Sequence, residues 1–131
     1  PAGHALARLE SVNFSRLAEV DVIALNAEDG SRKRLDALLR QAGQSLRVAI
    51  ETPYSSTVCQ LALAGHGVGI ANPATALGME AAGLSFRPLQ ASVHFECHMI
   101  VHGSRPLSEA GKFWATCLRA ALAPLIDRFG V

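Results

Sequence analysis

Three short apolar runs mark the first half of the chain, and each ends at a polar or turn-forming residue. They cover residues 22–25, 48–50 with their neighbours, and 68–71. Short runs that are apolar at nearly every position are typical of strands buried on both faces of a parallel sheet. Between them lie two segments, residues 31–42 and 55–64, whose patterns predict helices.

The first of these two helices has leucines at helical spacing on one face and charged residues on the other. Ser31 is a suitable N-cap, with Gly30 or Asp29 as alternatives, and Gly43 is a natural C-terminal stop. The second helix opens with a cluster of hydroxyl residues and is otherwise apolar nearly all round, so we expect it to be buried.

The pattern of apolar and polar residues also predicts the remaining helices and strands. We expect a helix at residues 14–19, a helix at 73–80 ended by Gly83, an edge strand at 84–89, a strand at 93–102 and a helix at 108–123. Ser108 can cap the last helix, and Pro124 should kink or end it. The order β-α-β-α-β-α-β-β-α predicts an α/β fold, a mixed but mostly parallel sheet flanked by helices. Right-handed crossovers then bring the turns after Leu25, Glu51 and Ala71 to one edge of the sheet.

Composition limits the possible functions. The chain has 131 residues, enough for one domain, and half of them are hydrophobic. Mean hydropathy is +0.24, yet no apolar stretch approaches the roughly 18–20 residues of a membrane span. A net charge of +1 gives no indication of nucleic-acid binding through this segment. The three cysteines, Cys59, Cys97 and Cys117, are widely spaced in apolar surroundings, which favours buried free thiols in a reducing cytosol.

Polar side chains gather at the predicted sheet edge. They are Asn26, Ser31, Thr52, Tyr54, Ser55 and Asn72. Hydroxyl groups at a helix N-terminus, together with its N–H groups and positive dipole end, suit an anion such as a carboxylate or sulfate. The same hydroxyls could instead only cap the helix. The pattern therefore indicates a binder of a small anionic molecule, with a purely structural role as the alternative.

Other chemistry is poorly supported. The glycines at 65, 67 and 69 end a helix and lead into a strand, the reverse of a dinucleotide-binding loop. His94, Glu96, His98 and His102 share one face of the predicted strand 93–102, but His94 and His98 would lie about 13 Å apart at a rise of ~3.3 Å per residue. We therefore expect no metal and no cofactor. A G-x-S-x-G nucleophile motif is missing, and Cys59 lies mid-helix among apolar residues, so catalysis is not expected.

Five segments in order resemble the effector-binding domain of the LysR-type transcriptional regulators. Residues 1–7, Pro-Ala-Gly-His-Ala-Leu-Ala, look like the family's P-x-x-H-P-L-A, and residues 12–18 are similar to its v-x-x-x-d-L-a. Residues 31–43 match the family's following helix, residues 63–73 parallel v-x-a-G-x-G-i-a-l-l-P, and residues 107–113 resemble the start of its closing helix.

The resemblance implies one lobe of a periplasmic-binding-protein-like type 2 fold, which has a Rossmann-like sheet. Residues 1–92 would form the second lobe, 93–103 a hinge strand, and 104–131 a C-terminal helix that returns to the first lobe. The first lobe and the DNA-binding winged helix-turn-helix would lie upstream of Pro1. Without that lobe, the helix would pack back on the second lobe, swap with a second chain, or be displaced.

The resemblance also implies a function. Family members are cytoplasmic dimers or tetramers that bind DNA through the N-terminal domain and have no membrane segment. A small effector, here a carboxylate, amino acid, aromatic acid or inorganic anion, would bind between the lobes. Thr52, Pro53, Tyr54, Ser55 and Asn72 would face this cleft, with Asn26 and Ser31 as further candidates.

Two departures and two alternatives accompany this interpretation. Ala5 stands where the family commonly has proline, and Asn72 stands where it has an apolar residue, so Asn72 is either a ligand contact or a turn former. The alternatives are a lobe of a periplasmic solute-binding transport protein and a small α/β enzyme. No export signal is visible in the sequence and the cysteines are unpaired, which counts against the transport protein.

Overall fold

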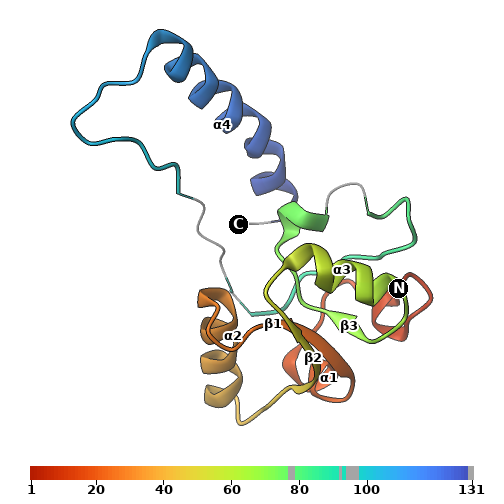
Figure 1. The fold of residues 1–131 in the computed structure, drawn as a ribbon. Coiled ribbons are helices and arrows are strands. Elements are labelled where there is room, and N and C mark those ends of the chain that lie inside the picture. Colours follow the sequence, from red (N-terminus) through yellow and green to blue (C-terminus); the bar gives the residue numbers. More distant parts are fainter. Residues whose placement is uncertain (77–78, 92, 94–97, 130–131) are drawn as a thin grey trace. The chain divides into compact units, whose positions relative to one another are not determined.

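A computed structural model of the chain describes residues 1–76, 79–91, 93 and 98–129. The chain divides into two compact units, Pro1–Val93 and His94–Val131. The first unit contains the sheet and three α-helices, and the second contains one long helix (Figure 1).

The first unit is built on three parallel strands in the order β2-β1-β3. The strands are β1 (Asp21–Leu25), β2 (Arg47–Thr52) and β3 (Val68–Gly69). Helix α2 (Gly30–Gln41) joins β1 to β2, and helix α3 (Ser55–Leu63) joins β2 to β3. Because all three strands run in the same direction, the turns that follow them meet at one edge of the sheet, as predicted. The mixed α/β architecture inferred from the apolar runs is confirmed.

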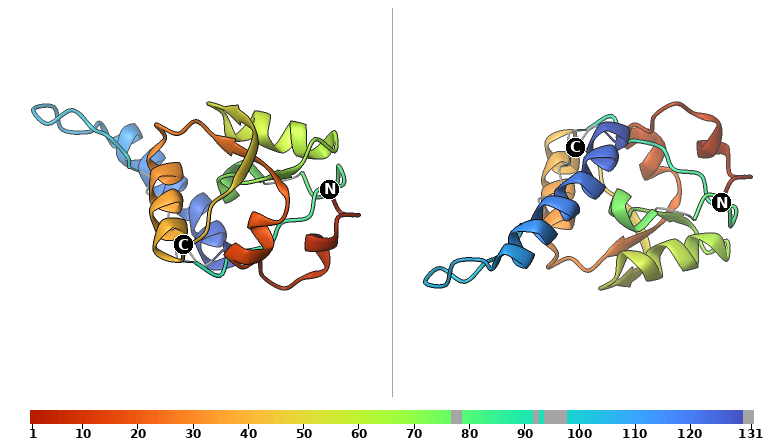
Figure 2. Two further views of the ribbon diagram at one scale, coloured as in Figure 1. Left: turned by 90° about the horizontal axis from the view of Figure 1, so that it is seen from below. Right: turned by 90° about the horizontal axis from the view of Figure 1, so that it is seen from above.

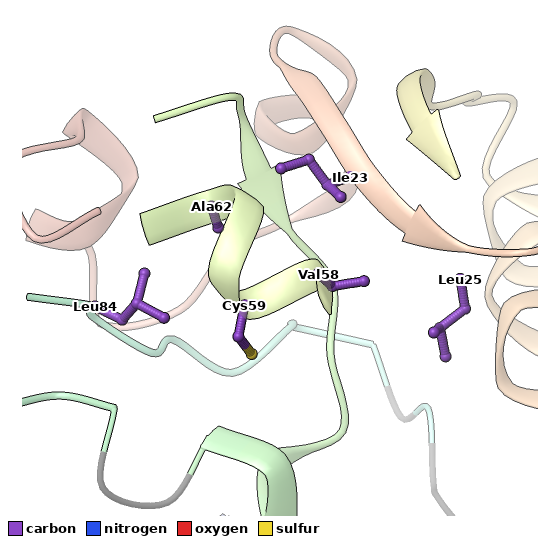
Figure 3. Packing of buried hydrophobic residues seen from close by; sticks show 6 residues of the cluster. All are labelled: Ile23, Leu25, Val58, Cys59, Ala62 and Leu84. Atoms are coloured by element: carbon purple, nitrogen blue, oxygen red, sulfur yellow. The ribbon is translucent and has the colours of Figure 1, made fainter. Parts of the chain in front are cut away.

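Alternate residues of β1 point to opposite faces of the sheet, and each face carries its own core. Ile23 and Leu25 pack with Val58, Cys59 and Ala62 of α3 and with Leu84 (Figure 3). The opposite face contains Leu6, Val12, Leu17, Val22 and Ala24. Helix α1 (Phe14–Ala18) and the 3-10 helix η1 (Ala5–Arg8) contribute to this second core, and α1 lies across the strands from α3 (Figure 2).

The predicted helix boundaries are close, with one correction at the start of α2. Asp29, and not Ser31, is the N-cap, because the Asp29 carboxylate accepts hydrogen bonds from the N–H groups of Ser31 and Arg32 at 2.8 and 3.1 Å. At the other end, Gly43 has φ of +66°, a left-handed conformation that glycine adopts readily. Helix α3 is amphipathic instead of fully buried, since Ser56 and Gln60 are exposed.

Two elements predicted between residues 73 and 89 are shorter than expected. The helix expected at 73–80 is a 3-10 helix, η2 (Pro73–Ala76), and residues 77–78 lie outside the described part. The edge strand expected at 84–89 is a single parallel bridge between Leu89 and Val12. Its hydrogen bonds are Val12 N–H to Pro88 O and Gln90 N–H to Val12 O, both 2.9 Å. Pro88 takes part in this bridge through its carbonyl oxygen, so the lack of an N–H group in proline does not prevent the bridge. The pairing does not extend beyond it.

The second unit contains helix α4 (Glu109–Phe129). The Ser108 hydroxyl accepts a hydrogen bond from the N–H of Gly111 at 3.1 Å and so caps the helix, as predicted. The helix continues through Pro124, so this proline does not end it; the other alternative, a kink at this position, stays a prediction. Phe113 and Trp114, on this helix, are 71% and 69% exposed.

The strand expected at residues 93–102 is absent from the described residues of this segment. Val93 and residues 98–102 are not part of any strand, and residues 94–97 lie outside the described part. Among the described residues, the helices include none that is long and apolar enough to cross a membrane.

The cysteine prediction is half right. Cys59 is a buried free thiol, and burial raises its pKa. Cys117 is free but exposed, which corrects the expectation of burial, and Cys97 lies outside the described residues.

Candidate functional site

The site predicted from the sequence lies where the three parallel strands end. β1 ends at Leu25 and β2 ends at Thr52, and these two residues are partners in the register. One residue beyond Leu25, the N–H of Asn26 donates to the carbonyl of Thr52 at 3.2 Å and continues the backbone hydrogen bonding between the two strands. The first two turns are therefore held against each other by the backbone.

Thr52 is the buried polar residue of this edge, with 7% of its surface exposed. Its hydroxyl oxygen lies 3.5 Å from the N–H of Tyr54, across the turn that leads into α3. Leu25, its register partner, belongs to the core under α3. The Thr52 side chain is therefore the innermost polar group in the turn between β2 and α3.

Ser55 and Asn72, which are 17 positions apart in the sequence, are brought together. The N–H of Asn72 donates to the Ser55 hydroxyl oxygen over 3.5 Å, so the first turn of α3 contacts the segment that follows β3. The side-chain carbonyl of Asn72 also accepts from the N–H of Ala74 at 2.8 Å. Asn72 is thus a turn former at the start of η2, and its side-chain NH₂ group remains as a donor.

The start of α3 has the electrostatics of an anion site. Tyr54 is its N-cap residue and is 66% exposed, and its side chain makes no capping hydrogen bond within the described part of the chain. Pro53 is also exposed. The N–H groups of a first helical turn have no partner inside the helix, and they carry its positive dipole end. The first three residues of the helix, Ser55, Ser56 and Thr57, are small and polar, which allows a ligand to approach the backbone.

Ser31 is engaged differently from what the sequence suggested. Its hydroxyl donates to the carboxylate of Asp29, and this bond, ahead of the backbone bonds from Arg32 and Ser31, lowers the pKa of Asp29. The N–H of Asp29 in turn donates to the carbonyl of Asn26 at 2.9 Å, while the Asn26 side chain is exposed. Ser31 is therefore part of the α2 cap.

The sequence analysis missed the most connected polar residue of this edge. Arg32 donates from Nη1 to the carbonyl of Leu25 at 2.8 Å and to Glu51 Oε1 at 3.0 Å. Its Nε lies 3.0 Å from both carboxylate oxygens of Asp36. The Arg-to-Asp spacing of four residues in a predicted helix could have indicated the last pair. The contacts to Leu25 and Glu51 depend on the three-dimensional fold, and the sequence carried no signal for them.

The metal and nucleophile alternatives find no support in the described residues. Within these residues, the histidine, cysteine and acidic side chains form no group of three that could hold a metal ion. His94 and Glu96 lie outside the described part, and the Nδ1 atom of His102 contacts the Ser104 hydroxyl at 3.1 Å. Cys59 is buried with a raised pKa, which disfavours the thiolate form that nucleophilic chemistry needs.

Comparison with known proteins agrees with the resemblance noted in the sequence. The family model of the LysR substrate binding domain matches residues 1–123. The Transcriptional activator protein LysR of Escherichia coli (strain K12) is 31% identical over 126 residues, which is 96% of this chain. The chain spans 40% of the length of that relative. LysR-type proteins are transcription regulators that bind small-molecule effectors and DNA. The chain therefore belongs to the LysR substrate binding domain family, whose members have a periplasmic-binding-protein-like fold.

Proposed function

We propose that this chain is the effector-sensing part of a LysR-type transcription factor. The observation that carries the proposal is the family match along residues 1–123, combined with a parallel sheet whose strand ends gather polar groups at one edge. In open α/β sheets, ligands bind at the carboxyl ends of the strands, next to the point where the strand order reverses. In the order β2-β1-β3 that point lies at β1.

The effector would bind at the turn between β2 and α3 and at the end of β3. Thr52, Pro53, Tyr54 and Ser55 line the first of these segments, and Asn72 stands at the second. The hydroxyls, the first-turn N–H groups of α3 and the Asn72 NH₂ group are all donors, so a small anion is the best match. Candidate effectors are carboxylates, amino acids, aromatic acids and inorganic anions such as sulfate.

Asn26 and Ser31 have a smaller part in the proposal. Asn26 binds the Thr52 carbonyl through its backbone N–H and has an exposed side chain, which could reach a bound molecule. The Ser31 hydroxyl is already bound to Asp29, and its removal should affect the α2 cap more than the effector.

In the complete regulator, the effector would lie in a cleft between this lobe (residues 1–92) and a first lobe encoded upstream. Residues 93–103 would serve as the hinge, and residues 104–131 would return to the first lobe. DNA would be bound by an N-terminal domain in a cytoplasmic dimer or tetramer, and the effector would change how that oligomer sits on its promoter. Family membership supports each of these points.

A transport role is the second candidate, because solute-binding proteins share the fold. The match to a transcriptional activator over 96% of the chain favours the regulator. Reporter transcription that responds to the effector, and is lost with the DNA-binding domain, would distinguish the two roles.

A thermal-shift screen of this chain tests the site first. Small carboxylates, amino acids, aromatic acids, sulfate and phosphate are each added at increasing concentration. A ligand present at 100 times its dissociation constant should stabilise the fold by about 2.7 kcal/mol. A selective hit supports a functioning half-site in this lobe. A cooperative melt that no compound shifts would mean that binding requires the first lobe.

Thr52→Val then tests the residue assignment in the complete regulator. The substitution keeps the shape of the side chain and removes the hydroxyl, so the response to effector should weaken by about tenfold while the protein stays folded. Thr116→Val, on exposed helix α4, is the matched control and should leave the response unchanged. An unaltered response in Thr52→Val would remove Thr52 from the site.

A further inference from the structure

Arg32 is nine-tenths buried, with 10% of its side chain exposed, and it connects three elements at the proposed site. It lies in the first turn of α2, where its Nη1 binds the carbonyl of Leu25 at the end of β1. The same nitrogen binds the carboxylate of Glu51 near the end of β2. A single guanidinium therefore cross-links the carboxyl ends of two neighbouring strands.

The cross-link stands next to the residues proposed to bind effector. Leu25 precedes Asn26, Glu51 precedes Thr52, and the Asn26 N–H to Thr52 carbonyl bond follows directly. The register between β1 and β2 shifts between Val22 and Ile23, so only three register pairs join the strands between that irregularity and the edge. A short ladder frays at its end unless further bonds hold it.

The charges around Arg32 argue against a direct role in holding the effector. Asp36 and Glu51 each lie 3.0 Å from the guanidinium, so one positive charge faces two negative charges. The cluster has a net charge of −1 and would repel an anion. Arg32 must therefore contribute to the site by holding its partners in position, because its positive charge is outweighed by the two carboxylates.

We infer that Arg32 is a positioning residue of the effector site. Through Leu25 and Glu51 it holds in place the backbone hydrogen bond from Asn26 N–H to the Thr52 carbonyl, called the Asn26–Thr52 rung below, and effector affinity depends on that rung. The inference rests on the site proposed above. The planar guanidinium donates to three acceptors at fixed angles, which a lysine ammonium on a flexible stem cannot reproduce. Arg32→Lys therefore keeps the charge and loses the geometry.

Amide hydrogen exchange on this chain reads out the rung without any ligand. In Arg32→Lys the exchange rate of the Asn26 amide should rise about tenfold. The Ile70 amide, which binds the carbonyl of Ile23 on the other side of β1, should change much less. Arg47→Lys is the matched control, because Arg47 pairs with Asp21 at the opposite, amino end of the same two strands. Exchange at Asn26 should be unaffected in that control.

Sulfate titration, followed by the amide signals of the first turn of α3, gives the second readout. Arg32→Lys should weaken sulfate binding at least threefold, and Arg47→Lys should not. If Arg32→Lys fails to fold, Glu51→Ala removes one partner of the cross-link and should raise Asn26 exchange about threefold.

The outcomes separate the two claims. Unchanged exchange at Asn26 in Arg32→Lys overturns the positioning role, whatever sulfate does. Faster exchange with unchanged sulfate affinity also overturns it, because the rung then does not control binding. Faster exchange in a chain whose parent binds no sulfate at α3 leaves the cross-link itself supported and overturns an anion site formed by this lobe alone, as distinct from one that requires the first lobe.

Discussion

Gly69, one of the two residues of β3, should not tolerate a side chain. A Cβ atom added there would lie 2.8 Å from Cγ1 of Val58, 3.3 Å from Cβ of Ala62 and 3.4 Å from the carbonyl oxygen of Val58. Carbon atoms in contact prefer about 3.5–4.0 Å, so the closest contact is too short by at least about 0.7 Å. Val58 is fully buried and stiff at χ1, so it cannot turn away. The substitution must separate β3 from α3.

The magnitude follows from the cost of overpacking. An extra methyl group in a closely packed core destabilises by about 1–3 kcal/mol. Any Gly→Ala change also restricts the unfolded chain, which stabilises the fold by about 0.4–1 kcal/mol. Gly30→Ala is the matched control, because a Cβ there meets nothing within 4 Å. Both substitutions restrict the unfolded chain to the same extent, so this contribution cancels when the two variants are compared. Gly69→Ala should therefore be less stable than Gly30→Ala by about 1–3 kcal/mol.

Urea unfolding followed by circular dichroism measures this difference for both variants beside the parent chain. Gly30→Ala should be as stable as the parent or slightly more stable. Gly69→Ala should have a lower midpoint, with an unchanged dependence on urea concentration. If the two variants agree within about 0.5 kcal/mol, α3 does not pack on β3 as closely as described, and the contact between Ser55 and Asn72 loses its support.

Three further predictions concern other parts of the chain. Because its pKa is lowered, Asp29 stabilises the fold fully above about pH 4, and this contribution disappears as the pH falls through the folded value. Asp29→Asn should flatten this part of the pH–stability curve, and an unchanged curve would contradict the α2 cap. Cys117→Ser should remove a fast-reacting thiol from a native-state titration and Cys59→Ser should not; equal losses would contradict the burial of Cys59. Pro124→Ala should stabilise α4 by up to about 3 kcal/mol in thermal melts followed by circular dichroism, and no change would mean that the helix does not continue past this position.

The central sheet was predictable because its strands are buried on both faces. Residues 22–25 are apolar throughout, and the structure buries all four of them. The edge strand expected at residues 84–89, where apolar and polar residues are mixed, is only one bridge beside Val12. Local sequence shows that a segment can be extended, but whether it joins a sheet depends on which neighbour presents a free edge.

Position in the sequence predicted which residues share the sheet edge but did not predict what each side chain does there. Ser31 was a sound candidate for an N-cap, yet Asp29 takes that role and also binds the Ser31 hydroxyl. The helix that was expected to present Ser31 begins one residue earlier, at Gly30. Polar side chains compete for the same few backbone N–H groups, and the winner is decided by the geometry of the turn.

The proposed anion site and the arginine cross-link make different use of the same sheet edge. In the proposed site, the donors to a ligand are backbone N–H groups and neutral side chains at the start of α3. The buried positive charge of Arg32 is instead neutralised by Asp36 and Glu51. An effector carboxylate would therefore be held by directed hydrogen bonds and a helix dipole, whose strength depends on the position of each donor. Such a site would be sensitive to small displacements of Thr52 and Ser55, so the residues that align β2 with β1 should matter for binding. In a two-lobed sensor, the same sensitivity would allow a shift in this edge to change effector affinity without any change in the residues that contact it.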